Sequence, residues 1–299
     1  MRIAAIDIGS NAVRLFVAQV HQNEDGILLE KLLHTRVPVR LGGDVFTFGK
    51  VSTERATQLS LTIKGFAAII EALSIDEVRA CATSALRSAE NRDDVVKQVK
   101  KVSGIEMKIL SGSEEAEMIF GNFSHYQLPK EHHYLFIDVG GGSTELTLIE
   151  RGVKKASQSF EVGTVRMLLN DQKKLPKAVF EWLVQYINPK MKYQAIATGG
   201  NINSAIKILE KKSGEFVSLE ELNNLKKQLS RCSKEQRMRK YKLREDRADV
   251  IVPALNIYTQ IADEVGIEEL LAPKFGLADG IVLEVLESKG FKDFKLISA

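Results

Sequence analysis

Residues 6–11 read Ile-Asp-Ile-Gly-Ser-Asn, and residues 137–144 read Ile-Asp-Val-Gly-Gly-Gly-Ser-Thr. In both stretches an apolar run ends in Asp-x-Gly, a turn of small polar residues follows, and a second apolar run begins. Because glycine has no Cβ, consecutive backbone N–H groups in such a turn can approach an anion closely. The repeated pattern predicts two β-hairpins whose turns bind phosphate, rather than two turns without a ligand.

The two turns also supply polar side chains. Asp7 and Asp138 end the two first strands, and carboxylate oxygens are the ligands that a hydrated Mg²⁺ prefers. We therefore expect these two aspartates to hold a cation or orient water, while the turns bind phosphate groups. The phosphate ligands expected within the turns are Ser10, Gly140, Gly141, Gly142, Ser143 and Thr144.

The repetition extends beyond the turns. Three apolar segments surround each of them, at residues 2–8, 12–20 and 27–37 and again at 134–139, 144–150 and 154–160. The segment between the two halves, residues 124–133, is polar, contains Pro129 and has no periodicity. A repeat far longer than a solenoid unit predicts two similar domains facing one another, residues 1–124 and 125–299.

Helical and strand periods alternate along both halves, which predicts an α/β fold. The remaining expected helices are residues 53–73, 93–103, 113–123, 164–170 and 177–188, the remaining strands are 77–82, 106–110 and 194–198, and the pattern after 198 is mostly helical. Ser113 has the character of a helix N-cap, and Glu114 and Glu115 follow in the first turn, where the helix dipole favours carboxylates.

Composition excludes several classes of protein. With 44% hydrophobic and 27% charged residues among 299, the chain is neither disordered, collagen-like nor a coiled coil, and its net charge of +3 gives no argument for nucleic acid. Cys81 and Cys232 show no metal-ligand spacing, so reduced thiols in a cytoplasm are expected. No apolar run reaches the ~18 residues of a membrane span, so we expect a cytoplasmic protein without a membrane partner.

Further motifs occur along the chain, at residues 82–87 (Ala-Thr-Ser-Ala-Leu-Arg), 109–116 (Ile-Leu-Ser-Gly-Ser-Glu-Glu-Ala), 162–166, 197–200, 247–251 and 276–280. Together with the two turns they resemble the exopolyphosphatase / guanosine pentaphosphate phosphohydrolase family, within the superfold of actin, sugar kinases and heat-shock-chaperone ATPases. The first two motifs are specific to the family. The resemblance implies two ribonuclease-H-like (actin-like ATPase) domains with an interdomain active-site cleft, a last helix that crosses back to the first domain, and a homodimer.

The family removes terminal phosphates from inorganic polyphosphate, and some members also convert guanosine pentaphosphate to tetraphosphate. The resemblance implies that Glu115 is the base that activates water and that Asp138 is the second catalytic residue. It also implies that Asp7 and Asp138 bind a divalent cation, Mg²⁺ or Mn²⁺. The further phosphate contacts that it implies are Asp7, Asn11, Arg14, Thr83, Ser84, Arg87, Arg166 and Arg247.

Two questions stay open at the level of sequence. Residues 231–247 hold eight Lys or Arg against three Asp or Glu, which suits either a solvated helix face or a surface that attracts a polyanion. With no aromatic residue nearby except Tyr241, nucleic-acid binding is not favoured. Three function classes remain: a phosphoanhydride hydrolase, an ATP-using kinase or ATPase, and a non-catalytic sensor of an alarmone nucleotide.

Overall fold

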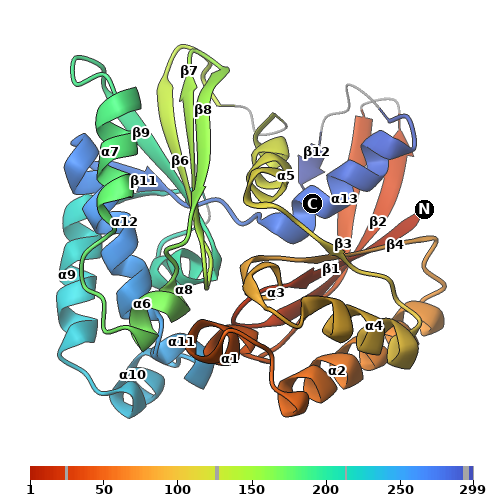
Figure 1. The fold of residues 1–299 in the computed structure, drawn as a ribbon. Coiled ribbons are helices and arrows are strands. Elements are labelled where there is room, and N and C mark those ends of the chain that lie inside the picture. The colour runs from red at the N-terminus through yellow and green to blue at the C-terminus, as the bar shows by residue number, and fades with distance from the viewer. Residues whose placement is uncertain (24–25, 125–127, 213, 292–295, 299) are drawn as a thin grey trace. The chain divides into compact units, whose positions relative to one another are not determined.

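The computed structural model describes residues 1–23, 26–124, 128–212, 214–291 and 296–298, and the chain divides into two compact units (Figure 1). Unit 1 comprises Met1–Gln127 and Phe275–Ala299, and unit 2 comprises Leu128–Lys274. Residues 275–299 lie with unit 1, as expected for a last helix that crosses back to the first domain, although the boundary expected from the sequence assigned them to the second. Within the described ranges, no helix is long and apolar enough to cross a lipid bilayer.

Unit 1 contains a six-stranded sheet in the order β12-β3-β2-β1-β4-β5. Its strands are β1 (Arg2–Ile8), β2 (Val13–Asn23), β3 (Gly26–Val37), β4 (Glu77–Ala82), β5 (Lys108–Ile109) and β12 (Leu296–Ser298). The first three strands are antiparallel neighbours, and β4 runs parallel to β1. The strand expected at residues 106–110 is shorter in the structure, because β5 pairs with β4 only at Cys81 and Ala82.

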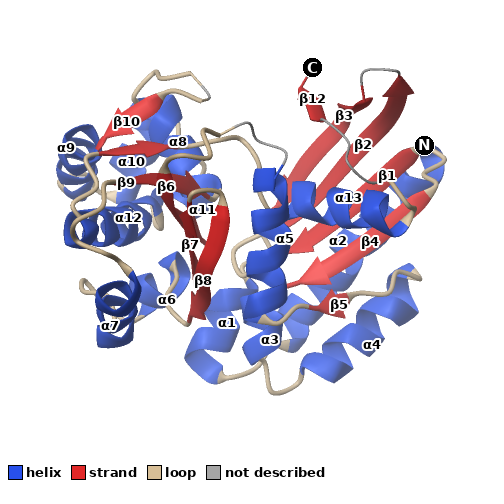
Figure 2. Cartoon of the chain, turned by 90° about the horizontal axis from the view of Figure 1, so that it is seen from above, coloured by secondary structure: helices blue, strands red, loops and turns tan. Residues whose placement is uncertain are grey.

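Helices cover this sheet. They are α1 (Leu41–Phe48), α2 (Thr53–Ala72), α3 (Ser84–Ser88), α4 (Arg92–Ser103), α5 (Gly112–Ser124) and α13 (Leu277–Ser288). Residues of α2 and α4 share one apolar cluster with Ile6 and Ile8 of β1, and strand alternation therefore turns Asp7 to the opposite face. On that face α13 packs against β1 and α5 (Figure 2).

The close packing of α13 on α5 explains why the end of the chain belongs to unit 1. Ile281, Val282 and Leu286 are fully buried. The Asn122 side-chain amide donates to the Gly276 carbonyl at 3.2 Å, and a Cβ on Gly280 would lie 2.2 Å from the Met118 carbonyl oxygen. The glycine thus allows the two helix backbones to touch.

Unit 2 contains a second six-stranded sheet, in the order β10-β11-β9-β6-β7-β8. Its strands are β6 (His133–Val139), β7 (Thr144–Glu150), β8 (Val153–Phe160), β9 (Tyr193–Thr198), β10 (Phe216–Ser218) and β11 (Glu269–Leu271). The last two, like β12, lie where the sequence pattern is mostly helical; each has three residues, which is too few to show a period.

The helices of unit 2 are α6 (Thr164–Leu169), α7 (Lys177–Tyr186), α8 (Gly200–Ile208), α9 (Leu219–Ser230), α10 (Lys234–Tyr241), α11 (Glu245–Ala248) and α12 (Ile251–Val265). Four of them, α6 to α9, pack against α12. Ile251, Leu255 and Tyr258 of α12 are completely buried in a cluster with the strands and with Trp182 of α7.

The internal repeat predicted from the two turns is confirmed by strand pairing. In unit 2, β6, β7 and β8 are antiparallel and β9 runs parallel to β6, as β4 does to β1 in unit 1. The registers also correspond. Asp7 lies opposite Arg14 across the first hairpin, whereas Asp138 lies opposite Glu145 across the second.

Candidate active site

The first glycine turn is fixed by its own backbone and by α1. Gly9 donates to the Ala12 carbonyl at 3.1 Å, and the Ser10 carbonyl accepts from the Gly42 amide at 2.8 Å. The Ser10 and Ser84 hydroxyl oxygens lie 2.8 Å apart, so two residues from distant motifs meet as expected. The polar residues buried at this end of the sheet are Asp7, Ser10, Asn11, Thr83 and Ser84.

Asp7 forms an ion pair with Arg14 across the hairpin. Asp7 is 4% exposed, so its carboxylate is shielded from water, whereas the Arg14 side chain is 27% exposed. Arg36 on β3 lies opposite Arg14. Arg36 therefore shares with Asp7 and Arg14 one face of the sheet. It was not among the site residues expected from the sequence.

Helix α3 connects this turn to Glu115. Ser84 is its first residue, and about one turn later Arg87 donates through Nη1 to Glu115 Oε2 at 3.0 Å and to the Leu110 carbonyl at 2.8 Å. Glu115 is 6% exposed and lies in the first turn of α5. Arg87, expected to contact phosphate, thus also contacts the expected catalytic base.

The neighbouring Glu114 has a different environment. Lys108 forms an ion pair with it at 2.8 Å, and the Ser111 amide donates to its Oε2 at 2.8 Å. The hydrogen bond from Lys108 and those from Ser111 lower the pKa of Glu114 to about 2. Glu114 therefore stays ionised and caps α5, while Glu115 is the buried member of the pair.

The carbonyl groups of the second glycine turn accept hydrogen bonds from residues at the start of α6. Gly140 O accepts from the Thr164 amide at 3.1 Å, Gly141 O from the Val165 amide at 2.8 Å, and Gly142 O from Arg166 Nε at 2.8 Å. The Gly140 amide donates to the Ser143 carbonyl at 3.0 Å and closes the turn, so an anion would be bound by the amide groups that follow Gly140. A Cβ on Gly163 would lie 2.5 Å from the Gly142 nitrogen, so only glycine allows this contact.

Two residues expected to bind phosphate make contacts within the protein. Arg166 holds the Gly142 carbonyl through Nε, and its Nη2 lies 3.7 Å from Glu161 Oε2. The Thr144 hydroxyl donates to the Val162 carbonyl at 2.7 Å. Ser143 is buried at the turn itself. Arg166 and Thr144 therefore shape the turn in this structure.

Asp138 is 8% exposed and accepts a hydrogen bond from the Thr198 hydroxyl. Glu145, directly opposite on β7, is 1% exposed, and its Oε1 accepts from the Ser159 hydroxyl at 2.7 Å. Directly opposite residues share one face of a sheet, so two carboxylates lie together here. Glu145 was not expected as a site residue. Its distance from the turn nevertheless equals that of Asp138, so the hairpin pattern of the sequence already places the two residues opposite each other.

This pair of carboxylates fits a hard divalent cation. Among the residues that the structure describes, no group of three or more His, Cys, Asp or Glu side chains has a metal-binding arrangement. Mg²⁺ is usually held by one or two carboxylates and completes its shell with water and substrate phosphates. Asp138 and Glu145 match that mode, whereas the carboxylate of Asp7 is engaged by Arg14.

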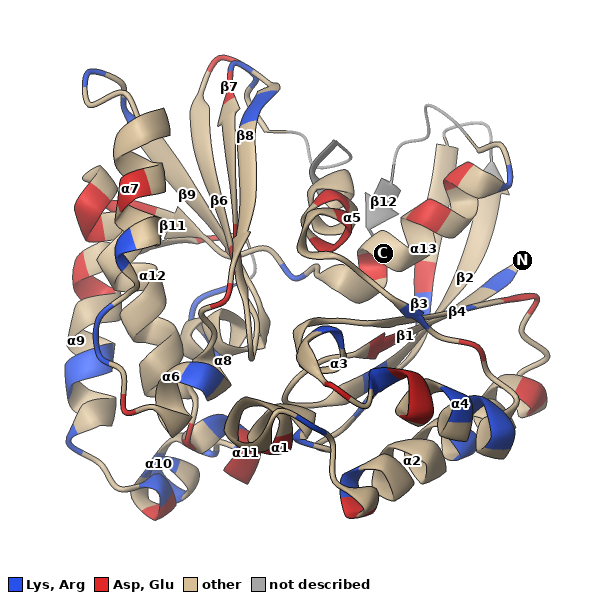
Figure 3. Cartoon of the chain, viewed as in Figure 1, with Lys and Arg blue, Asp and Glu red and all other residues tan. Residues whose placement is uncertain are grey.

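Arg247 belongs to α11, and its guanidinium lies at the start of α8. Its Nη1 donates to Asn201 Oδ1 at 3.2 Å, and a Cβ on Gly200 would lie 2.0 Å from its Nη2. A side chain at position 200 would therefore displace this guanidinium. Elsewhere in the basic stretch at 231–247, Arg237 of α10 donates to the Leu229 and Ala248 carbonyls. Further cations of the stretch lie on α10 and on the segments beside it (Figure 3).

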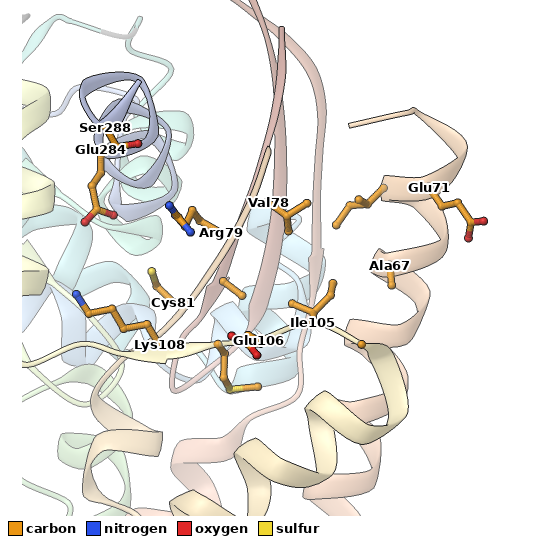
Figure 4. A pocket seen from close by; sticks show the side chains of 14 residues that line it. Ala67, Glu71, Val78, Arg79, Cys81, Ile105, Glu106, Lys108, Glu284 and Ser288 are labelled. Carbon is orange, nitrogen blue, oxygen red and sulfur yellow. The ribbon is translucent and has the colours of Figure 1, made fainter. Parts of the chain in front are cut away.

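A separate cavity of about 770 Å³ lies at the edge of the first sheet, where β5 is short (Figure 4). Arg79, Lys108 and Glu284 line one side of it, and Val78 lies on the other. None of the residues expected to bind phosphate is among its lining. Burial raises the pKa of Cys81, also in this wall, to about 12, so its thiol is neutral.

Comparison with known proteins places these features in a family. The family model described as the Ppx/GppA phosphatase family matches residues 17–289. The bifunctional 3-dehydroquinate synthase/phosphatase of Fusobacterium nucleatum is 28% identical over an alignment of 312 positions, which covers 96% of this chain and 47% of that protein. The chain thus spans about half the length of this curated relative.

Two solved structures share the fold. An exopolyphosphatase from Cytophaga hutchinsonii has a TM-score of 0.83 and 24% identity, with 96% of this chain and 98% of that chain covered. A Ppx/GppA family member from Aquifex aeolicus has a TM-score of 0.76 and 22% identity, with 98% and 99% covered. They confirm the predicted fold class, and the family model, which extends over most of the residues, shows that the chain belongs to the Ppx/GppA phosphatase family.

Proposed function

We propose that the protein is an exopolyphosphatase, which hydrolyses the terminal phosphate of inorganic polyphosphate with Mg²⁺ or Mn²⁺. Guanosine pentaphosphate, which presents a similar terminal phosphate group, is the proposed second substrate. The observation that carries this proposal is the contact between Arg87 and Glu115. A buried carboxylate held in one orientation suits the activation of water, and hydrolysis requires no second substrate pocket.

In the proposed reaction, Glu115 accepts a proton from the water that attacks the terminal phosphorus. The bond from that phosphorus to the bridging oxygen then breaks, and the shortened polyphosphate leaves. Phosphoryl transfer needs mainly positioning and neutralisation of charge. The amide groups of the second turn, fixed by Arg166 and by the segment after β8, supply positioned donors for the phosphate oxygens.

The divalent cation is proposed to bind to Asp138 and Glu145. When bound, it neutralises phosphate charge that these two carboxylates would otherwise repel. Two observations support this proposal. The two residues lie directly opposite each other across the hairpin, and hydrogen bonds from Thr198 and Ser159 orient Asp138 and Glu145 respectively. In unit 1, Arg14 and the Ser10–Ser84 hydroxyl pair are the proposed phosphate contacts.

The proposal is tested by phosphate release from long polyphosphate, short polyphosphate, guanosine pentaphosphate and ATP. Glu115→Gln should lower kcat on polyphosphate by about 10²- to 10⁴-fold, because it removes the base. Glu114→Gln is the matched control: it changes the adjacent, exposed member of the pair, and kcat should stay within a few-fold of the wild-type value.

Other outcomes would change the assignment. Release only from guanosine pentaphosphate would indicate an alarmone phosphatase with the same chemistry. Faster release from ATP than from polyphosphate would favour an ATPase or kinase. Full activity of Glu115→Gln would remove Glu115 from the mechanism.

A further inference from the structure

A buried hydroxyl group binds the end of β9 close to Asp138. Tyr258, in the middle of α12, is completely buried, and its hydroxyl donates to the Thr198 carbonyl. Thr198 is the last residue of β9, and the neighbouring strand β6 ends at Val139.

The position of this hydroxyl has a clear geometric reason. The pairing of β6 with β9 ends at the pair Asp138 and Thr198. Beyond that pair the chain turns away at Gly199, whose φ of 116° belongs to the region that favours glycine. A Cβ there would lie 2.7 Å from the Val139 carbonyl oxygen and 3.0 Å from the Tyr258 hydroxyl. The tyrosine hydroxyl therefore holds β9 at the point where its pairing with β6 stops.

The same strand ends carry the carboxylate and its orienting group. The Thr198 side chain donates to Asp138 Oδ1, and the Thr198 carbonyl accepts from Tyr258. We infer that Tyr258 is a positioning residue, which fixes Thr198 and thereby holds the Asp138 carboxylate in one orientation toward a divalent cation. This inference deepens the proposed function, because it rests on the cation site at Asp138.

Outer groups that orient metal ligands typically change metal affinity by 10- to 100-fold when they are removed. Tyr258→Phe keeps the ring in the core and deletes only the hydroxyl. We therefore expect this variant to bind Mn²⁺ about tenfold more weakly, measured without substrate from the free Mn²⁺ signal in electron paramagnetic resonance. With polyphosphate, the Mg²⁺ concentration for half-maximal rate should rise equally, and kcat should recover at saturating Mg²⁺.

Tyr193→Phe is the matched control. Tyr193 starts the same strand, β9, is 5% exposed, and donates its hydroxyl to Glu150 Oε1 at 2.9 Å. It thus loses the same group from the opposite end of the strand, and its Mn²⁺ affinity should equal that of the wild type. If Tyr258→Phe lowers only the melting temperature, or if both variants weaken Mn²⁺ binding equally, the inference fails.

A double-mutant comparison tests whether Tyr258 acts through Thr198. In a Thr198→Val background, which lacks the hydroxyl, Tyr258→Phe should cause no further loss of Mn²⁺ affinity; in Thr198→Ser the tenfold loss should persist. Additive losses in the Thr198→Val background would overturn the inference. A wild type that binds Mn²⁺ but releases no phosphate from polyphosphate would refute the proposed function alone, since the metal-binding comparison stands without it.

Discussion

Arg87 and Glu115 are 28 positions apart, and Arg87 Nη1 donates to Glu115 Oε2. Binding phosphate and orienting a base both require a cation, so residue type alone does not separate the two roles. The Leu110 carbonyl, which also accepts from Arg87 Nη1, fixes the guanidinium beside Glu115 and thereby favours the orienting role.

Arg87→Lys tests this assignment. Lysine keeps the positive charge but loses the planar donor group that reaches both acceptors. We expect kcat on polyphosphate to fall about 10- to 100-fold while KM stays within a few-fold, because misplacement of the base affects the chemical step. Steady-state kinetics on short polyphosphate measure both parameters. A raised KM with unchanged kcat would return Arg87 to the substrate.

At the scale of elements, the second turn depends on the contact between Gly163 and the glycines that follow β6. Gly163→Ala would place its Cβ 2.5 Å from the Gly142 nitrogen, so the turn must shift. We expect at least a tenfold loss of kcat/KM and a lower melting temperature. Phosphate release and thermal unfolding measure the two effects.

Gly65→Ala provides the control for that substitution. Gly65 is an exposed residue of α2, and no atom lies within 4 Å of its ideal Cβ. Replacing glycine by alanine inside a helix should raise the free energy of unfolding by about 0.5–1 kcal/mol and leave activity unchanged. If Gly163→Ala and Gly65→Ala had equal effects on activity and stability, the close approach at Gly163 would not be important for function.

These elements also show what local sequence can reveal. The hairpins were predictable because Asp-x-Gly interrupts two runs of β-branched residues, and turn chemistry acts over a few residues. Helix α1 was not predicted because Gly42 and Gly43, residues with low helix propensity, fall within its first turn. The roles of Arg166 and Glu145 depend on which chain segments meet in the fold. The position of Glu145 could have been predicted from the register of the hairpin, whereas no local pattern predicts the contact of Arg166 with the Gly142 carbonyl.

At the scale of the whole molecule, the return of α13 to unit 1 predicts the effect of shortening the chain. A chain that ends at Lys274 would expose the surface that Ile281, Val282 and Leu286 cover. Each such side chain contributes about 1.5–3 kcal/mol, against about 5–15 kcal/mol for a whole domain. We expect this chain to be insoluble or to lose the cooperative unfolding of unit 1, as measured by circular dichroism.

A chain that ends at residue 290 is the comparison, because it keeps α13 and loses only the three-residue strand β12 among the described elements. It should remain soluble and folded. Equal behaviour of the two shortened chains would contradict a structural role for α13 in unit 1.

Stability at alkaline pH is a second property of the whole molecule. Burial raises the pKa of Cys81 from 9.0 to about 12, and the pKa of Tyr258 well above 10.0. Above pH 9 the unfolded chain releases protons that the folded chain retains. The free energy of unfolding should therefore fall between about pH 9 and 12, by at most ~1.4 kcal/mol per pH unit for each group.

Urea unfolding at several alkaline pH values measures this slope. Cys81→Ala should make it shallower, since one of the retained protons is lost. An unchanged slope in this variant would show that the thiol titrates alike in both states.

The paired hairpins also bear on how such a molecule arises. Asp7 and Asp138 occupy equivalent strand ends, but the residue across the hairpin is Arg14 in one copy and Glu145 in the other. Both cross-strand pairs use the same backbone register and leave the apolar face of the sheet untouched. If both hairpins descend from one ancestral hairpin by gene duplication, substitutions at this one position would be enough to make one copy favour anions and the other favour cations. The core inherited by both copies would not have to change.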